Sequence, residues 1–468
     1  METKDSNLDI DLTPGASASF ASSAVKRPSD SSATPKGFRL HIGIFGRRNA
    51  GKSSLLNAIT RQQVSIVSEL AGTTTDPVEK PMELLPLGPV LFIDTAGIDD
   101  AGALGDLRVH KTRQIFSRTD LGVLVAESHV WGSFEEQILN ELRSREIPLV
   151  VVFNKCDLRP PDPAILDRLT ERGMAWVRTS AVEGSGIEDF RRALLANAPE
   201  EFAASPTIVR DLVGPGELAV LVVPIDTEAP KGRLKMLEVQ AIRDLLDGHS
   251  ACLVVQDGGL AGALDSLKHL PKLVVTDSQV FGRVSAVTPS GVPLTGFSIL
   301  LSRLKGDLQT QALGALAMAS LVPGDRVLVA EACSHHPIGE DIGRVKIPRW
   351  LTRHVGGALQ FTTVQGHDFP EDLSPYKLVI HCGACMLNRR EMLGRIQDCR
   401  RQGVPVTNYG VAIAYLFGIL ERALEPFPAV LAAYREAKRK NVPAGGGVGI
   451  ADRQHKPSTR CGVESNGL

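Results

Sequence analysis

The sequence predicts an α/β protein with three domains, the first of them built on a mostly parallel sheet. Apolar runs alternate with helix-like stretches from Phe38 onward, which is the pattern of parallel strands joined by helices. The length of 468 residues gives room for about three domains of roughly 150 residues each. We expect these domains at residues 38–200, 206–308 and 309–440, between disordered tails at residues 1–37 and 441–468.

The first domain contains four apolar runs that read as buried parallel strands, because they lack the polar alternation of half-exposed strands. Helix-like stretches begin after each run, at Lys52, Asp106, Ser133 and Ala164. The predicted strands are Leu40–Gly46, Val90–Gly97, Leu121–Glu127 and Pro148–Lys155.

The second and third domains repeat the strand–helix pattern. In the second, helices are expected at Leu234–Leu246 and Gly258–His269, and strands at Glu217–Asp226, Ala251–Asp257 and Lys272–Asp277. In the third, each predicted strand ends in a polar turn, and such strand ends are where ligand sites gather in open α/β sheets. These strands are Asp325–Cys333, Lys377–Cys385 and Val404–Gly410.

The composition of the chain narrows the possible classes of protein and of binding partner. The chain is 43% hydrophobic and 22% charged with a net charge of −1, so any affinity for phosphate must be local and no nucleic-acid partner is expected. No apolar run reaches the ~20 residues of a membrane-spanning helix, and the N-terminus lacks a secretory signal. We therefore expect a cytoplasmic protein without a membrane partner. Its 7 cysteines, an odd number, argue against a disulfide framework.

A phosphate-binding loop follows the first predicted strand. Residues Gly46–Ser53 fit the G-x-x-x-x-G-K-[ST] pattern between a strand and a helix, the context that supports such a match. The glycines allow backbone N–H groups to surround phosphates, Lys52 supplies a positive charge, and Ser53 can ligate Mg²⁺. The expected nucleotide contacts here are Gly46, Asn49, Ala50, Gly51, Lys52, Ser53 and Ser54.

Two further loops complete a predicted guanine-nucleotide site. Asp94 and Gly97 of a D-x-x-G motif are placed to hold Mg²⁺ and to sense the γ-phosphate. Asn154, Lys155 and Asp157 form an N-K-x-D loop, in which the Asp157 carboxylate can accept the N–H groups on the edge of guanine, a pair that adenine lacks. Ser180 and Ala181 suit a backbone contact to the guanine carbonyl. Either short motif alone would be an ordinary solvated turn.

These residues resemble the translation-factor-related GTPases, in the branch that contains TrmE, Era and EngA, over residues 38–197. The resemblance implies that Asn49 ligates an activating K⁺. It also implies that Thr74 or a neighbouring threonine, in a switch segment at residues 72–76, completes the Mg²⁺ shell. Lys52, Thr74, Asp94 and Gly97 then form the catalytic set. Ile98 stands where Ras-like GTPases carry a water-orienting glutamine, so slow, potassium-stimulated hydrolysis is expected. Asp106 either positions water or caps a helix.

A second constellation lies at the predicted strand ends of the third domain. Cys382 and Cys385 form a C-x-x-C pair in which Gly383 would permit the tight turn, and Cys333 offers a third thiolate. His335, His336 and His381 could each supply a fourth, weaker ligand. The residues alone fit equally an iron–sulfur cluster with one open iron or a Cys₃His zinc site, and three unrelated buried thiols are the remaining interpretation.

With both motif sets considered, residues 38–440 resemble the HydF family of [FeFe]-hydrogenase maturation GTPases, whose pattern is Cys-x-His, some 45 residues, then His-Cys-x-x-Cys. The resemblance implies a GTPase domain, a dimerisation domain and a cluster-binding domain, with a [4Fe-4S] cluster on Cys333, Cys382 and Cys385. It also implies a scaffold, dimeric or larger, that accepts a di-iron precursor made by the radical-SAM partners HydE and HydG and delivers it to apo-[FeFe]-hydrogenase.

Two other hypotheses fit part of the sequence. A ribosome- or tRNA-associated GTPase with a structural zinc would require a basic stripe beyond the first domain, and only short clusters such as Arg389–Arg390 and Arg400–Arg401 are present. A signalling GTPase with an unrelated appendage would leave the cysteine spacing unexplained. Metal analysis after anaerobic purification discriminates between iron and zinc.

Overall fold

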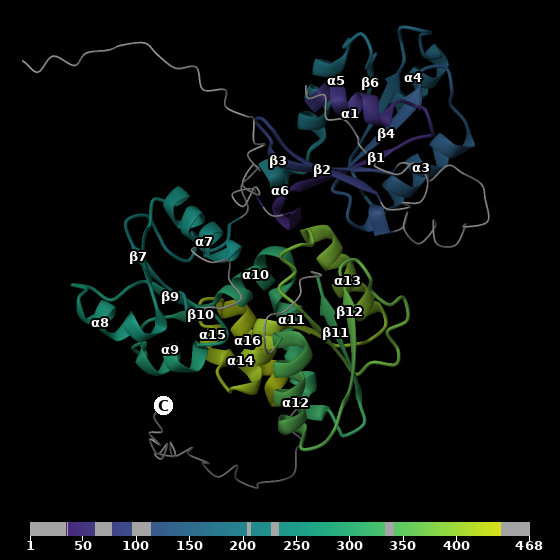
Figure 1. The fold of residues 1–468 in the computed structure, drawn as a ribbon. Coiled ribbons are helices and arrows are strands. Elements are labelled where there is room, and N and C mark those ends of the chain that lie inside the picture. Colours follow the sequence, from purple (N-terminus) through teal and green to yellow (C-terminus); the bar gives the residue numbers. More distant parts are fainter. Residues whose placement is uncertain are drawn as a thin grey trace, which may run out of the picture. The chain divides into compact units, whose positions relative to one another are not determined.

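A computed structural model describes residues 34, 36–60, 77–95, 114–203, 207–225, 234–332 and 341–440. Within these residues the chain forms three sheets, each accompanied by helices (Figure 1). This arrangement confirms the predicted α/β class. The predicted tails lie outside the described residues, apart from residues 34, 36 and 37. No helix of the described part combines the length and the apolar character needed to cross a membrane.

The first sheet has the strand order β2-β3-β1-β4-β5-β6. All neighbouring strands are parallel except the edge strand β2, which pairs antiparallel with β3. The strands are β1 (Leu40–Phe45), β2 (Val78–Leu84), β3 (Gly88–Asp94), β4 (Leu121–Glu127), β5 (Leu149–Asn154) and β6 (Ala175–Arg178), and a short helix η1 (Lys36–Phe38) precedes them.

Helices cover both faces of this sheet, which is why β1 and β5 are buried along their whole length. Leu55 of α1 and Phe190 of α5 pack on one face, whereas Leu139 of α3 and Leu169 of α4 pack on the other. The helices are α1 (Lys52–Thr60), α3 (Ser133–Ser144), α4 (Pro163–Glu171), α5 (Ile187–Asn197) and the short α6 (Glu200–Ala203).

The second sheet is fully parallel, in the order β10-β9-β7-β8. It comprises β7 (Leu218–Val222), β8 (Ala251–Val255), β9 (Leu273–Thr276) and β10 (Leu294–Gly296). Its helices are α7 (Met236–Asp247), η2 (Asp257–Gly259), α8 (Leu260–Asp265), α9 (Phe281–Val287) and α10 (Phe297–Lys305). The last of these leads directly toward the third sheet.

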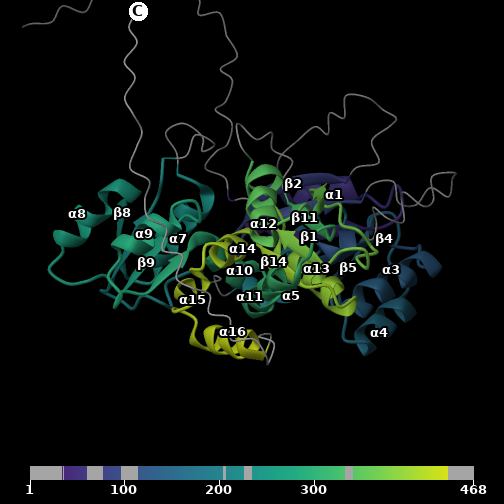
Figure 2. The same cartoon turned by 90° about the horizontal axis from the view of Figure 1, so that it is seen from below.

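The third sheet is also parallel, in the order β12-β11-β13-β14. It comprises β11 (Arg326–Glu331), β12 (Gln360–Gln365), β13 (Leu378–His381) and β14 (Val406–Asn408). The final helix, α16, lies beside α11 (Figure 2). The helices are α11 (Leu308–Ala315), η3 (Leu316–Ser320), the π-helical turn η4 (Ile342–Lys346), α12 (Ile347–Val355), α13 (Arg389–Arg401), α14 (Tyr409–Leu416), α15 (Leu420–Ala423) and α16 (Pro428–Lys440).

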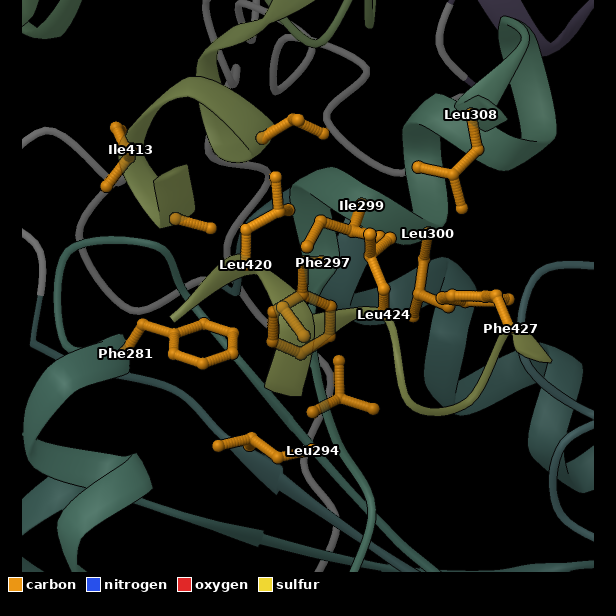
Figure 3. Packing of buried hydrophobic residues seen from close by; sticks show 14 of the residues in the cluster. Phe281, Leu294, Phe297, Ile299, Leu300, Leu308, Ile413, Leu420, Leu424 and Phe427 are labelled. Carbon is orange, nitrogen blue, oxygen red and sulfur yellow. The ribbon is translucent and has the colours of Figure 1, made fainter. Parts of the chain in front are cut away.

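One hydrophobic core joins the second and third sheets (Figure 3). Phe281 and Leu294 from the second sheet region, Phe297 and Leu300 from α10, and Leu424 after α15 belong to the same buried cluster. The two domains therefore share packing, and α10 is held between them. This fixes the position of Lys305, the last residue of that helix.

The predicted strands are present but several are shorter than expected. Those expected to run to Gly97, Cys333 and Cys385 end at Asp94, Glu331 and His381. Gly97 and Cys333 lie outside the described residues, whereas residues 382–385 belong to the loop after β13. The helix expected from Asp106 lies outside the described residues. Strands β2, β6, β10 and β12 were not predicted.

Candidate functional site

The phosphate-binding loop connects β1 to α1, and two of its glycines occupy positions closed to other residues. Gly46 has φ +147° and a Cβ there would lie 2.1 Å from Val125 O. Gly51 has φ +90° and its Cβ would lie 2.2 Å from Asn154 Nδ2. The loop backbone therefore packs directly against Val125 and Asn154, and only glycine fits at these two positions of a phosphate-binding loop.

Charged and hydroxyl groups converge at the same loop. Lys52 is buried, and its Nζ donates to Gly46 O at 2.5 Å and to Arg47 O at 2.8 Å. Its side chain therefore ties the end of the loop to the start. Ser53 Oγ at the start of α1 donates to Asp94 Oδ2 at the end of β3, at 3.0 Å. A hydroxyl and a carboxylate are thus in contact where Mg²⁺ would need both.

Asn154 ties the base-reading loop to the phosphate-binding loop. Its Nδ2 donates to Ala50 O at 2.9 Å, and its Oδ1 accepts from Thr179 Oγ1 at 3.1 Å and from Ala181 N at 3.2 Å. Ser180 is buried in the same turn. Asn154 thus holds three predicted nucleotide segments together.

The two charged residues of the base-reading loop, Lys155 and Asp157, have different surroundings. Lys155 has φ +63° and its Nζ donates to Glu127 at 2.8 Å, which holds the loop to the end of β4. Asp157 is exposed, so its carboxylate is accessible to a base.

Not every predicted residue of this site can be located. Thr74, Gly97 and Asp106 lie outside the described residues. One contact was not predicted: Arg47 Nε and Nη2 donate to Glu135 Oε1 and Oε2 at 2.7 and 2.9 Å. This bidentate pair anchors the phosphate-binding loop to α3. The two residues are 88 positions apart, so no local pattern indicates the contact.

The C-x-x-C pair lies in the loop that follows β13. Cys382 Sγ accepts hydrogen bonds from Ala332 N at 3.0 Å and from Ala384 N at 3.4 Å, whereas Cys385 is exposed. The turn differs from the prediction, because the left-handed residue is Ala384, with φ +53°, and not Gly383. Instead, Gly383 gives room for Leu301, whose Cδ2 would lie 3.0 Å from a Cβ at this position.

His381 is buried next to these thiols with both ring nitrogens engaged. Nδ1 contacts Cys382 O at 3.0 Å, so it carries the proton, and Nε2 accepts from Arg395 Nη1 at 3.0 Å. Burial and the neighbouring Arg395 charge lower the pKa of His381 to about 3. In this arrangement neither nitrogen is available to a metal, which makes His381 a structural residue of the loop.

A lysine behind the loop was not predicted. Lys305 is 3% exposed, and its Nζ donates to Ala384 O at 2.9 Å, Cys385 O at 3.2 Å and Leu387 O at 2.8 Å. Burial lowers the pKa of Lys305 to about 7, although the neighbouring Cys385 and Cys382 act in the opposite direction. A single lysine at the end of an apolar helix gives no sequence signal for such a role.

The third predicted thiolate, Cys333, and His335 lie outside the described residues. Within the described ranges, no group of three or more His, Cys, Asp or Glu side chains is placed to hold a metal ion. The described donors nevertheless fit a thiolate-bound metal, since two N–H groups already point at the Cys382 sulfur and Cys385 lies at the protein surface.

The fold and the nucleotide site define a P-loop GTPase with two further α/β domains. Family models agree with this class: a 50S ribosome-binding GTPase matches residues 41–155, the hydrogen maturase F dimerization domain matches residues 208–306, and the hydrogen maturase F tetramerization domain matches residues 309–426. The chain belongs to the hydrogen maturase F family. This agrees with the resemblance found in the sequence.

Curated relatives match over the first domain. The tRNA modification GTPase MnmE of Synechococcus sp. (strain CC9902) is 36% identical over 159 residues, which are 33% of this chain and 33% of that protein. The GTPase Der of Wolinella succinogenes is 36% identical over 124 residues, 26% of each chain. The chain thus spans about 33% of the length of the MnmE relatives.

Solved structures give a similar but weaker match. Era from Aquifex aeolicus bound to GDP·AlF₄⁻ is 20% identical and aligns with 53% of this chain and 97% of its own, at a TM-score of 0.30. The G domain of the T. maritima FeoB iron transporter is 23% identical and aligns with 35% of this chain and 99% of its own, at a TM-score of 0.28.

Proposed function

We propose that this protein is a GTP-hydrolysing scaffold of hydrogenase maturation. It carries a [4Fe-4S] cluster on Cys333, Cys382 and Cys385, receives the di-iron precursor of the H-cluster, and transfers it to apo-[FeFe]-hydrogenase. The radical-SAM maturases HydE and HydG are the proposed sources of that precursor, and the cytoplasm is the proposed location. Membership of the hydrogen maturase F family supports the maturation role.

One contact carries the cluster proposal. Ala332 N donates to Cys382 Sγ at 3.0 Å, and Ala332 is the residue that immediately precedes Cys333 in the sequence. The chain entering Cys333 therefore touches the sulfur of another proposed ligand. Backbone N–H groups directed at a sulfur favour its thiolate, the form that binds iron. Burial outweighs them before a metal binds and raises the pKa of the Cys382 thiol to about 11.

The protein's own residues divide the work at the cluster. The thiolates of Cys333, Cys382 and Cys385 would hold the cluster, and His335 is the candidate for a fourth, exchangeable ligand. When bound, the cluster would supply an exchangeable coordination position for the di-iron precursor. His381 and Lys305 hold the backbone of the loop: His381 contacts Cys382 O, and Lys305 donates to Ala384 O and Leu387 O.

The nucleotide half of the proposal assigns one role to each loop. Lys52 and the loop amides bind phosphates, Ser53 and Asp94 hold Mg²⁺, and Asp157 selects guanine. In the switch segments, Thr74 is proposed to complete the Mg²⁺ shell and Gly97 to sense the γ-phosphate. Asn49, which has φ +64° in the phosphate-binding loop, is the proposed K⁺ ligand. With Ile98 in place of a water-orienting glutamine, hydrolysis is expected to be slow.

The decisive experiment compares Cys382→Ser with Cys252→Ser, a cysteine of β8 outside the loop. After anaerobic reconstitution, Cys382→Ser should lose the iron and the EPR signal of the reduced cluster, because one thiolate is missing. Cys252→Ser should keep both. GTP hydrolysis, measured in KCl and in NaCl, should be the same in both variants and faster in KCl.

Normal iron binding by Cys382→Ser would refute the cluster assignment. One zinc and no iron per chain, after purification without oxygen, would favour the alternative of a ribosome- or tRNA-associated GTPase with a structural zinc. That alternative is favoured by one observation, the match of residues 41–155 to a ribosome-binding GTPase model. Hydrogen evolution after mixing the cluster-loaded protein with apo-[FeFe]-hydrogenase tests transfer itself.

A further inference from the structure

We propose that Lys305 positions the metal-binding loop, Cys382–Leu387, by holding its backbone in the left-handed turn at Ala384. The proposal rests on the proposed cluster site, but its first test needs no cluster. It assigns a function to the last residue of α10, a helix of the domain that precedes the loop's own.

The hydrogen bonds from Lys305 to the loop use every N–H donor of its ammonium group. Lysine has three N–H donors, and Nζ of Lys305 reaches three carbonyl oxygens of the loop, those of Ala384, Cys385 and Leu387, at 2.9, 3.2 and 2.8 Å. These oxygens belong to a stretch of four residues, and the chain within this stretch curves around the ammonium group. No side-chain carboxylate takes part in these three contacts.

The residue that needs holding is Ala384. A left-handed conformation is strained for a residue with a Cβ, and Ala384 adopts it with φ +53°. Its carbonyl is fixed by Lys305, and its N–H is directed at Cys382 Sγ at 3.4 Å. The same peptide segment thus links the lysine to the sulfur. Without the lysine, the turn would lose the contact that offsets its strain.

Burying a lysine is costly, and packing does not require one here. Lys305 ends the 9-residue helix FSILLSRLK, whose other buried residues are apolar except for Ser302. An apolar residue would suit the surrounding core, whereas a buried ammonium group must be satisfied by acceptors. A loop that carries two proposed ligands benefits from such support, because metal sites need their ligands held before the metal arrives.

The first test uses the full-length, cluster-free protein. Lys305→Met should raise the amide hydrogen-exchange rate of the 382–388 segment at least tenfold, because the Leu387 N–H bond to Ala384 O depends on the turn. Lys268→Met, which removes an exposed lysine, is the matched control and should leave that segment unchanged. Unchanged exchange in Lys305→Met would overturn the proposal.

The second test asks whether conformation is the cause. Lys305→Met should bind at most half the iron of the wild type after anaerobic reconstitution. Ala384→Gly removes the left-handed penalty, so the double variant Lys305→Met/Ala384→Gly should recover at least half of the lost iron. Full iron binding by Lys305→Met, or no recovery in the double variant while Ala384→Gly alone binds iron normally, would overturn the proposal.

Folding and the underlying site are controlled separately. GTP hydrolysis and the melting temperature report whether each variant is folded. If Lys305→Met is unstable, Lys305→Gln, which keeps an N–H donor on a shorter side chain, replaces it in both tests with the same expected direction. If the wild type binds no iron, the cluster proposal fails, but the exchange experiment still decides whether Lys305 fixes the loop.

Discussion

At the residue scale, the proposed recognition of guanine depends on a side chain that the fold presents to solvent. Asp157 is exposed, while its neighbour Asn154 is buried and bonded to Ala50, Thr179 and Ala181. The loop therefore combines an internal amide, which fixes the geometry, with an external carboxylate, which is accessible to the proposed guanine ligand. A substitution at Asp157 should change specificity without disturbing the loop.

We predict that Asp157→Asn lowers the affinity for GTP about 10- to 150-fold. Hydrogen bonds to a charged group contribute roughly 1.5–3 kcal/mol, and an amide at this position presents one oxygen and an N–H where guanine offers two donors. Xanthine carries a carbonyl where guanine has its amino group, so the variant should bind xanthosine triphosphate better than the wild type does. Titration with fluorescent nucleotide analogues measures both affinities.

Asp162 provides the control for this substitution. It lies in the following loop, where its side chain caps α4 by accepting from Ala164 N at 3.0 Å. Asp162→Asn should keep wild-type affinity for GTP, because asparagine also caps helices. Equal GTP affinity of Asp157→Asn and the wild type would contradict the assigned role of Asp157.

At the element scale, the edge strand β2 shows what sequence patterns do and do not reveal. Its sequence, VEKPMEL, contains a proline and alternates irregularly between exposed and partly buried positions. Such a strand gives little periodic signal, and proline is tolerated there because the strand is at a sheet edge. Charged contacts instead fasten it: Glu79 accepts from Lys36 Nζ at 2.5 Å and from Arg118 Nη1 at 2.6 Å.

We predict that Glu79→Gln destabilises the protein at neutral pH and not in acid. Burial alone would raise the pKa of Glu79, but the hydrogen bond from Lys36 and the Arg118 charge outweigh it and lower the pKa to about 2. Since this folded-state value lies below the ordinary 4.5, the stabilisation is complete above about pH 4.5 and is lost as the pH falls toward 2.

The size of that effect is roughly 1–2 kcal/mol after allowance for solvent screening. Urea unfolding of wild type and variant between pH 7 and pH 3 should show the two midpoints converging as the pH falls. Glu83→Gln is the control on the same strand, because Glu83 is 58% exposed and 3.8 Å from Arg39. A pH-independent difference for Glu79→Gln would show that lost packing, and not charge, is responsible.

Elements with strong local patterns could be predicted, and contacts between distant segments could not. The strands ending at Asp94 and Asn154 were expected because apolar runs and motifs coincide in a few consecutive residues. The short β10, LTG, and the partly exposed β12, QFTTVQ, have neither feature. They form because neighbouring strands supply hydrogen-bonding partners for their backbones, which is a property of the tertiary structure.

The same limit applies to the candidate site. The phosphate-binding and base-reading loops are contiguous motifs, so their residues were named from the sequence. Lys305 is about 80 positions from the carbonyls it contacts, and the turn was assigned to Gly383 because glycine is the usual left-handed residue. Ala384 takes that conformation because tertiary contacts on both sides of it hold it there.

At the scale of the whole molecule, two sheets share a core, and the β8 edge of the second sheet carries exposed apolar side chains. In the second sheet, β8 is an edge strand that pairs with β7 along one side. Val254 of β8 is 40% exposed, and α7, which packs on β8, exposes Val239 by 44% and Leu246 by 55%. An edge strand with exposed apolar neighbours is a template for pairing with another chain.

We therefore predict that the β8 edge contributes to self-association, for which the dimerization and tetramerization domains provide independent support. Val254→Lys places a charge on this edge and should raise the dimer dissociation constant at least tenfold, equivalent to about 1.4 kcal/mol. Sedimentation velocity over a concentration series measures the change. Val287→Lys, at a valine of α9 that is 42% exposed, should leave association unchanged. Equal weakening by both substitutions would indicate a general effect of added charge, and no change with Val254→Lys would place the contact on another surface.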